Sequence, residues 1–272
     1  MEKLGIIAGN GDYPLLVAQG ARKSGVKRIV VAALIGETKR EIEAYSDVVC
    51  WIEVGQLGKL ISFFKKNDIT NVIMAGQVTP TRLFGRLKLD LRMVKLLAKI
   101  KMRGAEPIFS TIASELSSFG INLIDSSMFM KEQLAHEGIM SGGRIARKFL
   151  KDIKFGIGIA KAIANMDIGQ TVVVKDKTIV AVEGIEGTDA TIERAGELAG
   201  KDCVVIKVSK KNQDMRFDLP VIGMKTINIM EKTKARVLAV EAAKTIILNK
   251  SSVLEKANEL GIIIYGFSEK DS

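Results

Sequence analysis

Three carboxylates lie close together in AVEGIEGTDA, residues 181–190, where an apolar strand pattern gives way to a helical one. Glu183, Glu186 and Asp189 are spaced by three residues. Carboxylates at such a corner can hold a divalent cation or take a proton from water. Thr188 or Asp189 could instead cap the helix that follows. Glu183 ends the strand, where its side chain either points into a cleft or is simply solvated.

A second group of charged residues follows in KVSKKNQDMRFDLPVIG, residues 207–223. The segment begins with basic and polar residues: Lys207, Lys210, Lys211 and Gln213. Acidic and basic residues then alternate at every second position: Asp214, Arg216 and Asp218. In an extended segment the last three residues share one face. Such a face is either a structural ladder of ion pairs or the arrangement that phosphoryl transfer needs. In that chemistry, carboxylates orient Mg²⁺ and water while cations offset the charge of the phosphates.

A glycine-rich turn, IAGNGDYP at residues 7–14, follows a strand pattern and opens a helical one. Its glycines let the backbone approach a phosphate, and the start of a helix offers N–H groups to it. Pro14 stands where the dinucleotide fingerprint has its third glycine, and no acidic residue ends the second strand pattern. The turn therefore disfavours NAD, and leaves open a plain tight turn or a contact to a phosphate or nucleotide sugar.

The elements that must position these residues alternate between strand and helix patterns in the first half. Apolar runs predict strands at 4–8, 28–34, 47–54, 71–75 and 121–124, and periodic stretches predict helices at 13–23, 37–45, 56–67, 90–102 and 107–119. This alternation is typical of a doubly wound parallel sheet.

The second half has a different pattern. Glycines gather between residues 134 and 147, so we expect two domains, residues 1–133 and 134–272. Beyond that boundary we expect strands at 171–174, 178–182, 203–208, 236–240, 245–248 and 262–265, and helices at 158–165, 190–198, 226–232 and 252–260. This pattern predicts a mixed α/β domain that carries both acidic groups. Because the glycine turn lies in the other half, we expect a cleft between the two domains.

The composition limits the chemistry. The 272 residues include one histidine, His136, and two cysteines, which excludes metal sites built from several histidines or cysteines. A bound metal would have mostly oxygen ligands, which favours Mg²⁺, with Mn²⁺ possible. No apolar run reaches the roughly 18 residues of a membrane span, and the first residues lack a signal-peptide pattern. We therefore expect a cytoplasmic protein.

The net charge of +10 is concentrated in one segment. Between Arg82 and Arg103, eight basic residues stand against Asp90 alone and contribute +7. Such a segment is a solvated helix face, a contact to an anionic membrane surface or a contact to nucleic acid. Aromatic residues are not interleaved with the basic ones, which disfavours nucleic acid.

The two charged motifs, AVEGIEGTDATI at 181–192 and KNQDMRFDLPVIG at 211–223, strongly resemble the hallmark motifs of the LpxI family, the UDP-2,3-diacylglucosamine pyrophosphatases of lipid A synthesis. IAGNGDYP at 7–14, MAGQVTP at 74–80 and DIGQTVVVK at 167–175 fit the same family, so the resemblance covers essentially the whole chain. It implies a Rossmann-like N-terminal domain and a C-terminal domain particular to the family, with a lipid product held between them. It also implies Mg²⁺-dependent hydrolysis to UMP and 2,3-diacylglucosamine 1-phosphate. The basic segment near 90–103 departs from the family.

The resemblance matches Asp214 and Asp218 to the motif's aspartates, at least one of which should be essential. We expect Asp218 first of all to orient or deprotonate the attacking water. The expected catalytic residues are Asp218, Asp214, Glu186 and Glu183, and the expected metal ligands are Asp214, Asp218 and Asp189. The expected substrate contacts are the backbone N–H groups of Gly9, Asn10 and Gly11, together with Gln77, Thr188, Lys207, Lys210, Gln213 and Arg216.

An alternative from a different class stays open: a protein that binds a nucleotide sugar or a phospholipid-like ligand without turnover. If the chain is the enzyme, its lipid-linked substrate and its basic segment predict a peripheral position on the anionic inner face of the inner membrane. The family suggests a homodimer, and no nucleic-acid partner is expected.

Overall fold

The computed structural model describes residues 1–78, 89–98, 105–211, 213–216 and 219–268. The chain divides into two compact units. The N-terminal unit consists of Met1–Met130 and Asp214–Asp218, and the C-terminal unit consists of Lys131–Gln213 and Leu219–Ser272. The main division falls close to the expected boundary at 133/134. A short segment of the second acidic motif nevertheless groups with the N-terminal unit, which the sequence pattern does not predict.

A five-stranded parallel sheet forms the N-terminal unit, in the order β3-β2-β1-β4-β5. Its strands are β1 (Lys3–Ala8), β2 (Arg28–Leu34), β3 (Val48–Ile52), β4 (Asn71–Ala75) and β5 (Asn122–Leu123). The chain winds outward from β1 to β3 on one side and then continues on the other side with β4. The strand order therefore reverses between β1 and β4, the place where doubly wound sheets bind their ligands.

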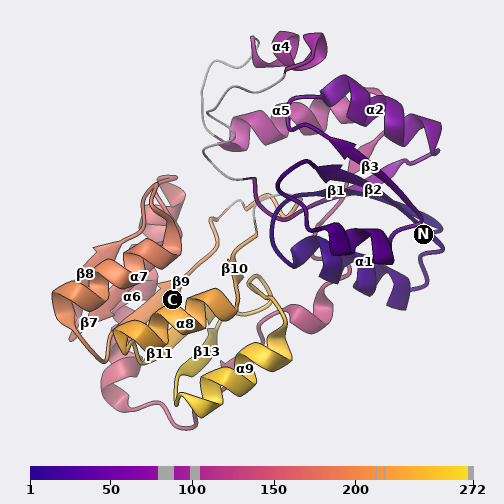
Figure 1. Cartoon of the computed structure of the whole chain (residues 1–272). Coiled ribbons are helices and arrows are strands. Elements are labelled where there is room, and N and C mark those ends of the chain that lie inside the picture. Colours follow the sequence, from indigo (N-terminus) through magenta and orange to yellow (C-terminus); the bar gives the residue numbers. More distant parts are fainter. Residues whose placement is uncertain (79–88, 99–104, 212, 217–218, 269–272) are drawn as a thin grey trace. The chain divides into compact units, whose positions relative to one another are not determined.

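Helices cover both faces of this sheet (Figure 1). Helix α1 (Tyr13–Lys23) lies on one side, and α2 (Leu57–Lys66), α4 (Leu91–Leu97) and α5 (Ala105–Ser118) lie on the other. The short 3₁₀ helix η1 (Arg40–Tyr45) stands where the sequence predicts a helix at 37–45. In α2 the buried residues recur at helical spacing, which lets one face of the helix pack on the sheet: Leu57, Leu60, Ile61 and Phe64.

The C-terminal unit contains a six-stranded mixed sheet in the order β6-β13-β11-β9-β7-β8. Its strands are β6 (Gly138–Ile139), β7 (Thr171–Lys175), β8 (Thr178–Val182), β9 (Val204–Lys207), β11 (Val237–Glu241) and β13 (Ile263–Phe267). Strands β9, β11 and β13 are parallel, whereas β7 runs antiparallel to β9. The start of β7 therefore lies at the same edge as the ends of β8, β9 and β11. A small parallel pair, β10 (Val221–Ile222) and β12 (Ile246–Ile247), lies apart from this sheet.

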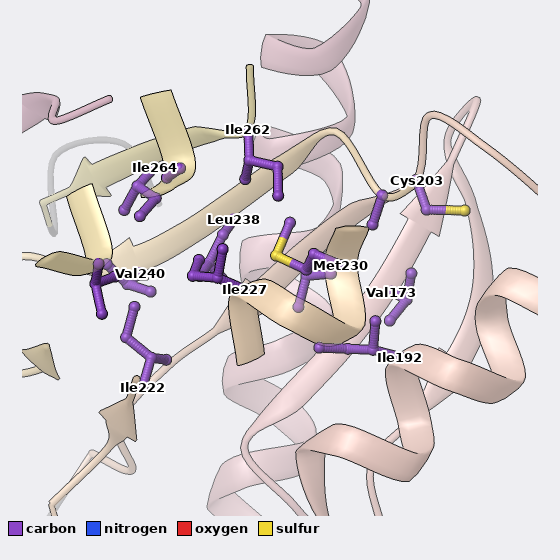
Figure 2. Close-up of a cluster of buried hydrophobic side chains, with 14 of the residues drawn as sticks. Val173, Ile192, Cys203, Ile222, Ile227, Met230, Leu238, Val240, Ile262 and Ile264 are labelled. Carbon is purple, nitrogen blue, oxygen red and sulfur yellow. The ribbon is translucent and has the colours of Figure 1, made fainter. Parts of the chain in front are cut away.

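Each face of the mixed sheet packs against helices. On one face lie α7 (Gly187–Ala199), α8 (Met224–Thr233) and α9 (Lys250–Glu259). Ile192 of α7 lies beside Val173 of β7, and Ile227 of α8 lies beside Leu238 of β11, all in one buried cluster (Figure 2). On the other face lies α6 (Arg147–Asn165), with a buried stripe at helical spacing: Phe149, Ile153, Ile157, Ala160 and Ala164. The C-terminal unit begins with the 3₁₀ helix η2 (Lys131–Gln133).

The predicted fold class is confirmed: a Rossmann-like parallel sheet is followed by a mixed α/β unit. The predicted hairpin at 175–177 is also present, since Asp176 and Lys177 have positive φ and Asp152 accepts both of their N–H groups. The helix predicted at 158–165 is wrong at its start, because α6 begins at Arg147.

The basic segment is described only in part. Helix α4 covers Leu91–Leu97, and the remainder of the predicted helix at 90–102 lies largely outside the described residues. Among the helices that are described, none is long and apolar enough to cross a membrane.

Candidate functional site

The glycine turn lies at the reversal point of the parallel sheet. Gly9 follows β1 and Gly76 follows β4, and the two connections cross closely. A Cβ on Gly9 would lie 2.5 Å from the carbonyl oxygen of Gln77, and one on Gly76 would lie 2.5 Å from that of Asn10. Glycine is therefore needed at both positions for the loops to meet. Asn10 and Gln77 form an isolated bridge between them and remain exposed.

The backbone N–H groups of this turn already have partners. Gly9 donates to Ala75 over 2.8 Å, and Asn10 donates to Gln77 over 2.7 Å. Gly11 donates to the side-chain oxygen of Asn10 over 2.7 Å. The geometry does not support the expectation that these N–H groups receive a substrate phosphate. The exposed side chains of Asn10 and Gln77 are the groups that this edge offers to a ligand.

The segment at Asp214 belongs to the same unit as the glycine turn and is fixed near β5. Both the N–H and the hydroxyl of Ser126, a buried residue shortly after β5, donate to the carbonyl of Met215 over 3.0 Å. Strands β1, β4 and β5 are neighbours, so their carboxyl ends share one edge of the sheet. The acidic segment thus lies at the edge where such a sheet binds ligands.

Asp214 and Arg216 form a two-pronged ion pair. The guanidinium donates from Nη2 to one carboxylate oxygen over 2.6 Å and from Nε to the other over 2.9 Å. The hydrogen bonds from Arg216 hold the pKa of the Asp214 carboxyl below its usual value. This contact is the ion-pair alternative that the alternating charges left open. Asp218 lies outside the described residues, as does Asn212.

In the C-terminal unit, Lys207 ends β9 with only 7 % of its surface exposed. Its ammonium donates to the hydroxyl of Thr188 over 2.8 Å and, over 3.5 Å, to that of Thr171. Thr188 in turn donates to Glu183 over 2.9 Å. Among the residues that the structure describes, no carboxylate lies within ion-pair distance of Lys207. A buried cation whose partners among the described residues are all hydroxyl groups is suited to binding an anion, because none of those partners neutralises its charge.

The other two acids at the strand-to-helix corner have cationic partners. Glu186 accepts from Arg194 over 3.0 Å and from the N–H of Gly184 over 3.1 Å. Asp189 pairs with Lys225 over 2.7 Å. The N-cap of α7 is Glu186, with no side-chain cap, so capping by Thr188 or Asp189 is wrong.

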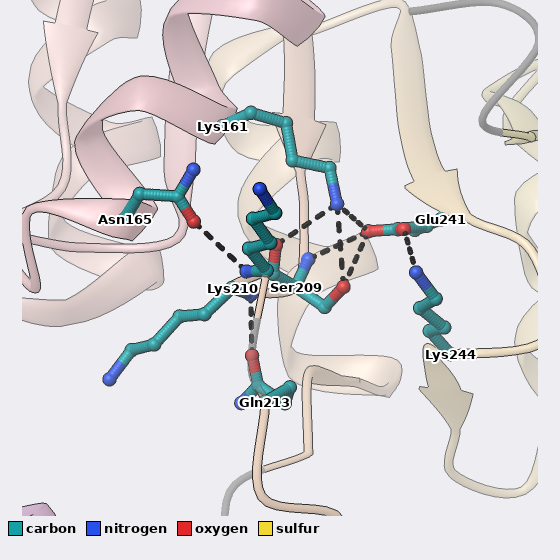
Figure 3. Close-up of polar contacts among 8 residues, drawn as sticks. Lys161, Asn165, Ser209, Lys210, Gln213, Glu241 and Lys244 are labelled. Atoms are coloured by element: carbon teal, nitrogen blue, oxygen red, sulfur yellow. Dashed lines mark hydrogen bonds and ion pairs between the residues drawn. The ribbon is translucent and has the colours of Figure 1, made fainter.

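The residues after Lys207 are organised by side chains that hold the backbone (Figure 3). The N–H of Lys210 donates to Gln213 over 2.6 Å, and the N–H of Lys211 donates to Asn165 over 2.9 Å. The ammonium of Lys210 pairs with Asp167. The described contacts of Gln213 and Lys210 therefore shape the loop, and their expected substrate contacts stay predictions.

Glu241, at the end of β11, joins this loop through a buried network. Its side chain is 2 % exposed and pairs with Lys161 at 2.5 Å and with Lys244 at 2.8 Å. It also accepts from the hydroxyl of Ser209 over 2.7 Å. Burial alone would raise the pKa of Glu241, but these hydrogen bonds outweigh it and lower the pKa to about 2.

The lowered pKa predicts how acid acts on stability. Glu241 stabilises the fold fully above its ordinary pKa of 4.5, and this contribution is lost as the pH falls through about 2. The shift corresponds to on the order of 3 kcal/mol at neutral pH. We expect urea unfolding to show Glu241→Gln less stable than the parent at pH 7, with the difference shrinking below pH 4.5. A difference that stays constant down to the lowest pH that preserves folding would contradict this role for the ionised carboxylate.

The described carboxylates do not fit a metal site. No group of three or more His, Cys, Asp or Glu side chains among the described residues is placed to hold a metal ion. Asp214 is occupied by Arg216, and Asp189 by Lys225. The described residues therefore provide no preformed Mg²⁺ cage.

Sequence reasoning thus found Lys207, Thr188 and Glu183, which the structure brings together in the C-terminal unit. It did not single out Lys161, Ser209 and Glu241, which hold the loop after β9. It also missed Ser126, which holds the Asp214 segment in the N-terminal unit. One signal was available, because Glu241, like Glu183, stands directly after an apolar run that predicts a strand.

Comparisons with known proteins cover both halves of the chain. Residues 3–133 match the family model described as the LpxI N-terminal domain, and residues 136–265 match the LpxI C-terminal domain. A relative from Caulobacter vibrioides, named UDP-2,3-diacylglucosamine pyrophosphatase LpxI, is 26% identical over 282 residues, covering 100% of this chain and 99% of its own. Among solved structures, the biotin carboxylase domain of Hydrogenobacter thermophilus 2-oxoglutarate carboxylase matches at 15% identity and a TM-score of 0.29. That match covers 73% of this chain and 41% of the other, and its likeness is too low to carry weight.

Proposed function

The chain belongs to the LpxI family, and we propose that it hydrolyses the pyrophosphate of UDP-2,3-diacylglucosamine to UMP and 2,3-diacylglucosamine 1-phosphate. The observation that carries this proposal is the match of both family domains, together with a full-length relative whose name states that substrate. The reaction is a phosphoryl transfer to water, so it needs a positioned water and cations for the developing negative charge.

Lys207 is the described residue best suited to the second need. It is buried, the described contacts of its ammonium are all to hydroxyl groups, and it ends the strand that leads into the acidic motif. A phosphate oxygen beside this ammonium would gain a charge-assisted hydrogen bond in a poorly solvated place. We assign Lys207 and Thr188 to the pyrophosphate, and Asp218 to the attacking water.

Mg²⁺ remains the predicted cofactor, with Mn²⁺ as an alternative. In phosphoryl transfer, Mg²⁺ usually keeps several waters and binds through one or two carboxylates together with the substrate's phosphates. This mode needs no preformed cage, so it is compatible with carboxylates that are already paired in the free protein. Its contribution would be to neutralise charge on the pyrophosphate.

The proposal predicts release of UMP from UDP-2,3-diacylglucosamine in detergent micelles when Mg²⁺ is present. Excess chelator should abolish release, and Mg²⁺ added back should restore it. Chromatographic detection of UMP makes the measurement. Turnover that persists in chelator would remove the metal from the proposal. A folded protein that binds the substrate but releases no UMP would instead favour the alternative, a ligand-binding protein without catalysis.

We also propose that the enzyme works at an anionic membrane surface, where its diacylated substrate resides. On α4, Leu91 and Val94 are 82% and 49% exposed, beside the exposed Lys95, whereas Arg92 pairs with Glu115 over 2.8 Å. Exposed apolar and basic side chains on one short helix suit an interface with acidic lipids, at about 1 kcal/mol for each basic residue near it.

Sedimentation with vesicles tests this membrane contact. The protein should pellet with vesicles that contain phosphatidylglycerol, less so at high salt, and weakly with phosphatidylcholine alone. Replacing Leu91 and Val94 by serine should reduce the bound fraction. Equal binding to both lipids, or to neither, would contradict it. The homodimer suggested by the family stays a prediction, which light scattering at micromolar concentration tests.

A further inference from the structure

Directly after β9 the N–H of Val208 still donates to the carbonyl of Gln170 over 2.9 Å, but the next three amides are all held by side chains. The N–H of Ser209 donates to Glu241 over 2.9 Å, that of Lys210 to Gln213 over 2.6 Å and that of Lys211 to Asn165 over 2.9 Å (Figure 3). The carbonyl of Ser209 also accepts from Lys161 over 3.0 Å. The backbone at the root of this loop is therefore fixed on both its donor and its acceptor side.

The side chains that hold it come from rigid elements. Lys161 and Asn165 are four residues apart near the end of α6, so they share one face of that helix. Glu241 is the last residue of β11, which pairs with β9 along its length. Glu241 is also ion-paired to Lys161 and Lys244, which holds its carboxylate in place. A loop attached to a helix end and a strand end in this way is oriented by the scaffold.

We propose that Glu241 and Lys161 are positioning residues, which fix the root of the loop whose later residues carry the chemistry. This inference rests on the proposed function, because the acidic motif that starts a few residues further on supplies the expected general base. Neither residue is placed against the substrate. They act by setting the direction in which the chain leaves β9, and a displacement of about 1 Å at a reacting group can cost about 100-fold in rate.

Glu241→Gln tests the proposal, with Glu193→Gln as the matched control. Glu193 pairs with Lys232 over 3.0 Å between α7 and α8 and holds no loop. In Glu241→Gln, hydrogen exchange measured by mass spectrometry should be at least about tenfold faster in the peptide that spans residues 209–211. Peptides from the central strands β9 and β11 should exchange faster only by the amount that the loss of stability measured in urea requires, and the control should leave all of them unchanged.

Kinetics provides the second readout. We expect kcat for UMP release to fall by about 10- to 100-fold in Glu241→Gln, with KM within about threefold of the parent. Exchange at 209–211 that matches the parent, or exchange that rises equally throughout the C-terminal unit, would overturn the proposal. So would a kcat as high as that of the control.

The two readouts separate this inference from the proposed function. If the parent protein releases no UMP, the enzymatic activity fails, while the exchange comparison still decides whether Glu241 holds the loop. If Glu241→Gln does not fold, Lys161→Met gives the same comparison. That variant removes the contact to the Ser209 carbonyl but leaves Glu241 paired with Lys244.

Discussion

Asp218→Ala is expected to lower kcat for UMP release by about 10²- to 10⁴-fold, the usual contribution of a general base. The expectation is strengthened by the neighbouring aspartate of the motif. Asp214 accepts two side-chain hydrogen bonds from Arg216, which hold its pKa low and engage its carboxylate. A carboxylate held in this way is a weak base, so we assign the proton-accepting role to Asp218 rather than to Asp214.

The isosteric Asp218→Asn should lose activity to a similar extent, since it keeps the size of the side chain and removes only its basicity. Asp68→Asn is the matched control, because Asp68 pairs with Lys3 at the surface and its side chain is 80% exposed. Steady-state assays with circular dichroism on each variant make the measurement. If Asp218→Asn retained near-parental kcat in a folded protein, the general base would have to be sought elsewhere.

Lys207→Met is the second large effect that we expect, a loss of about 10²- to 10³-fold in kcat/KM. This is the range measured when one donor to a developing negative charge is removed. Methionine keeps most of the apolar stem and fills the buried space, but it cannot donate to an anion or to Thr188. The loss should appear mainly in kcat, because the charge on the pyrophosphate changes most in the transition state.

The control for Lys207→Met is Lys232→Met, which removes an exposed lysine from α8 that pairs with Glu193. Thermal unfolding shows whether either variant is destabilised. Since the ammonium of Lys207 has no carboxylate partner among the described residues, its removal strands no buried acid, and the fold should tolerate it. A Lys207→Met protein with parental kcat/KM would place the pyrophosphate at another cation.

Strand and helix periods were enough to predict most of the parallel sheet, because its strands are largely apolar, with β1 and β2 almost wholly buried, while the helices between them are amphipathic. Helix α6 shows why the pattern fails elsewhere. Gly156 and Gly158 interrupt the helical signal in sequence, so only the last part of α6 was predicted. In the structure a Cβ on Gly156 would lie 2.1 Å from Ile206, so this glycine allows the helix to approach β9 closely. Local propensity cannot register a requirement set by a distant strand.

The candidate site was predictable where chemistry and motif coincide. Glu183 and Thr188 belong to one motif and Lys207 to the other, and each was a candidate from its own motif. That the three meet at one sheet edge was not predicted. Their partners could not be foreseen in the same way. Arg216 beside Asp214 was one of two open alternatives, and the pairing of Asp189 with Lys225 joins the starts of two helices. Pairings of that kind depend on how helices pack, which spacing within one segment does not fix.

The segment Asp214–Asp218 has a consequence for how this chain was inherited. A protein in which a later stretch of sequence completes the earlier domain cannot exchange that domain with a relative as a simple cassette. Recombination between the halves would combine the Ser126 region of one protein with the acidic motif of another. Because Ser126 reaches the carbonyl of Met215 rather than its side chain, such a junction constrains the path of the chain more than the residue at 215. The two halves should therefore be inherited as one unit. Among relatives, the number of residues that lead to this segment should vary less than the residue type at position 215.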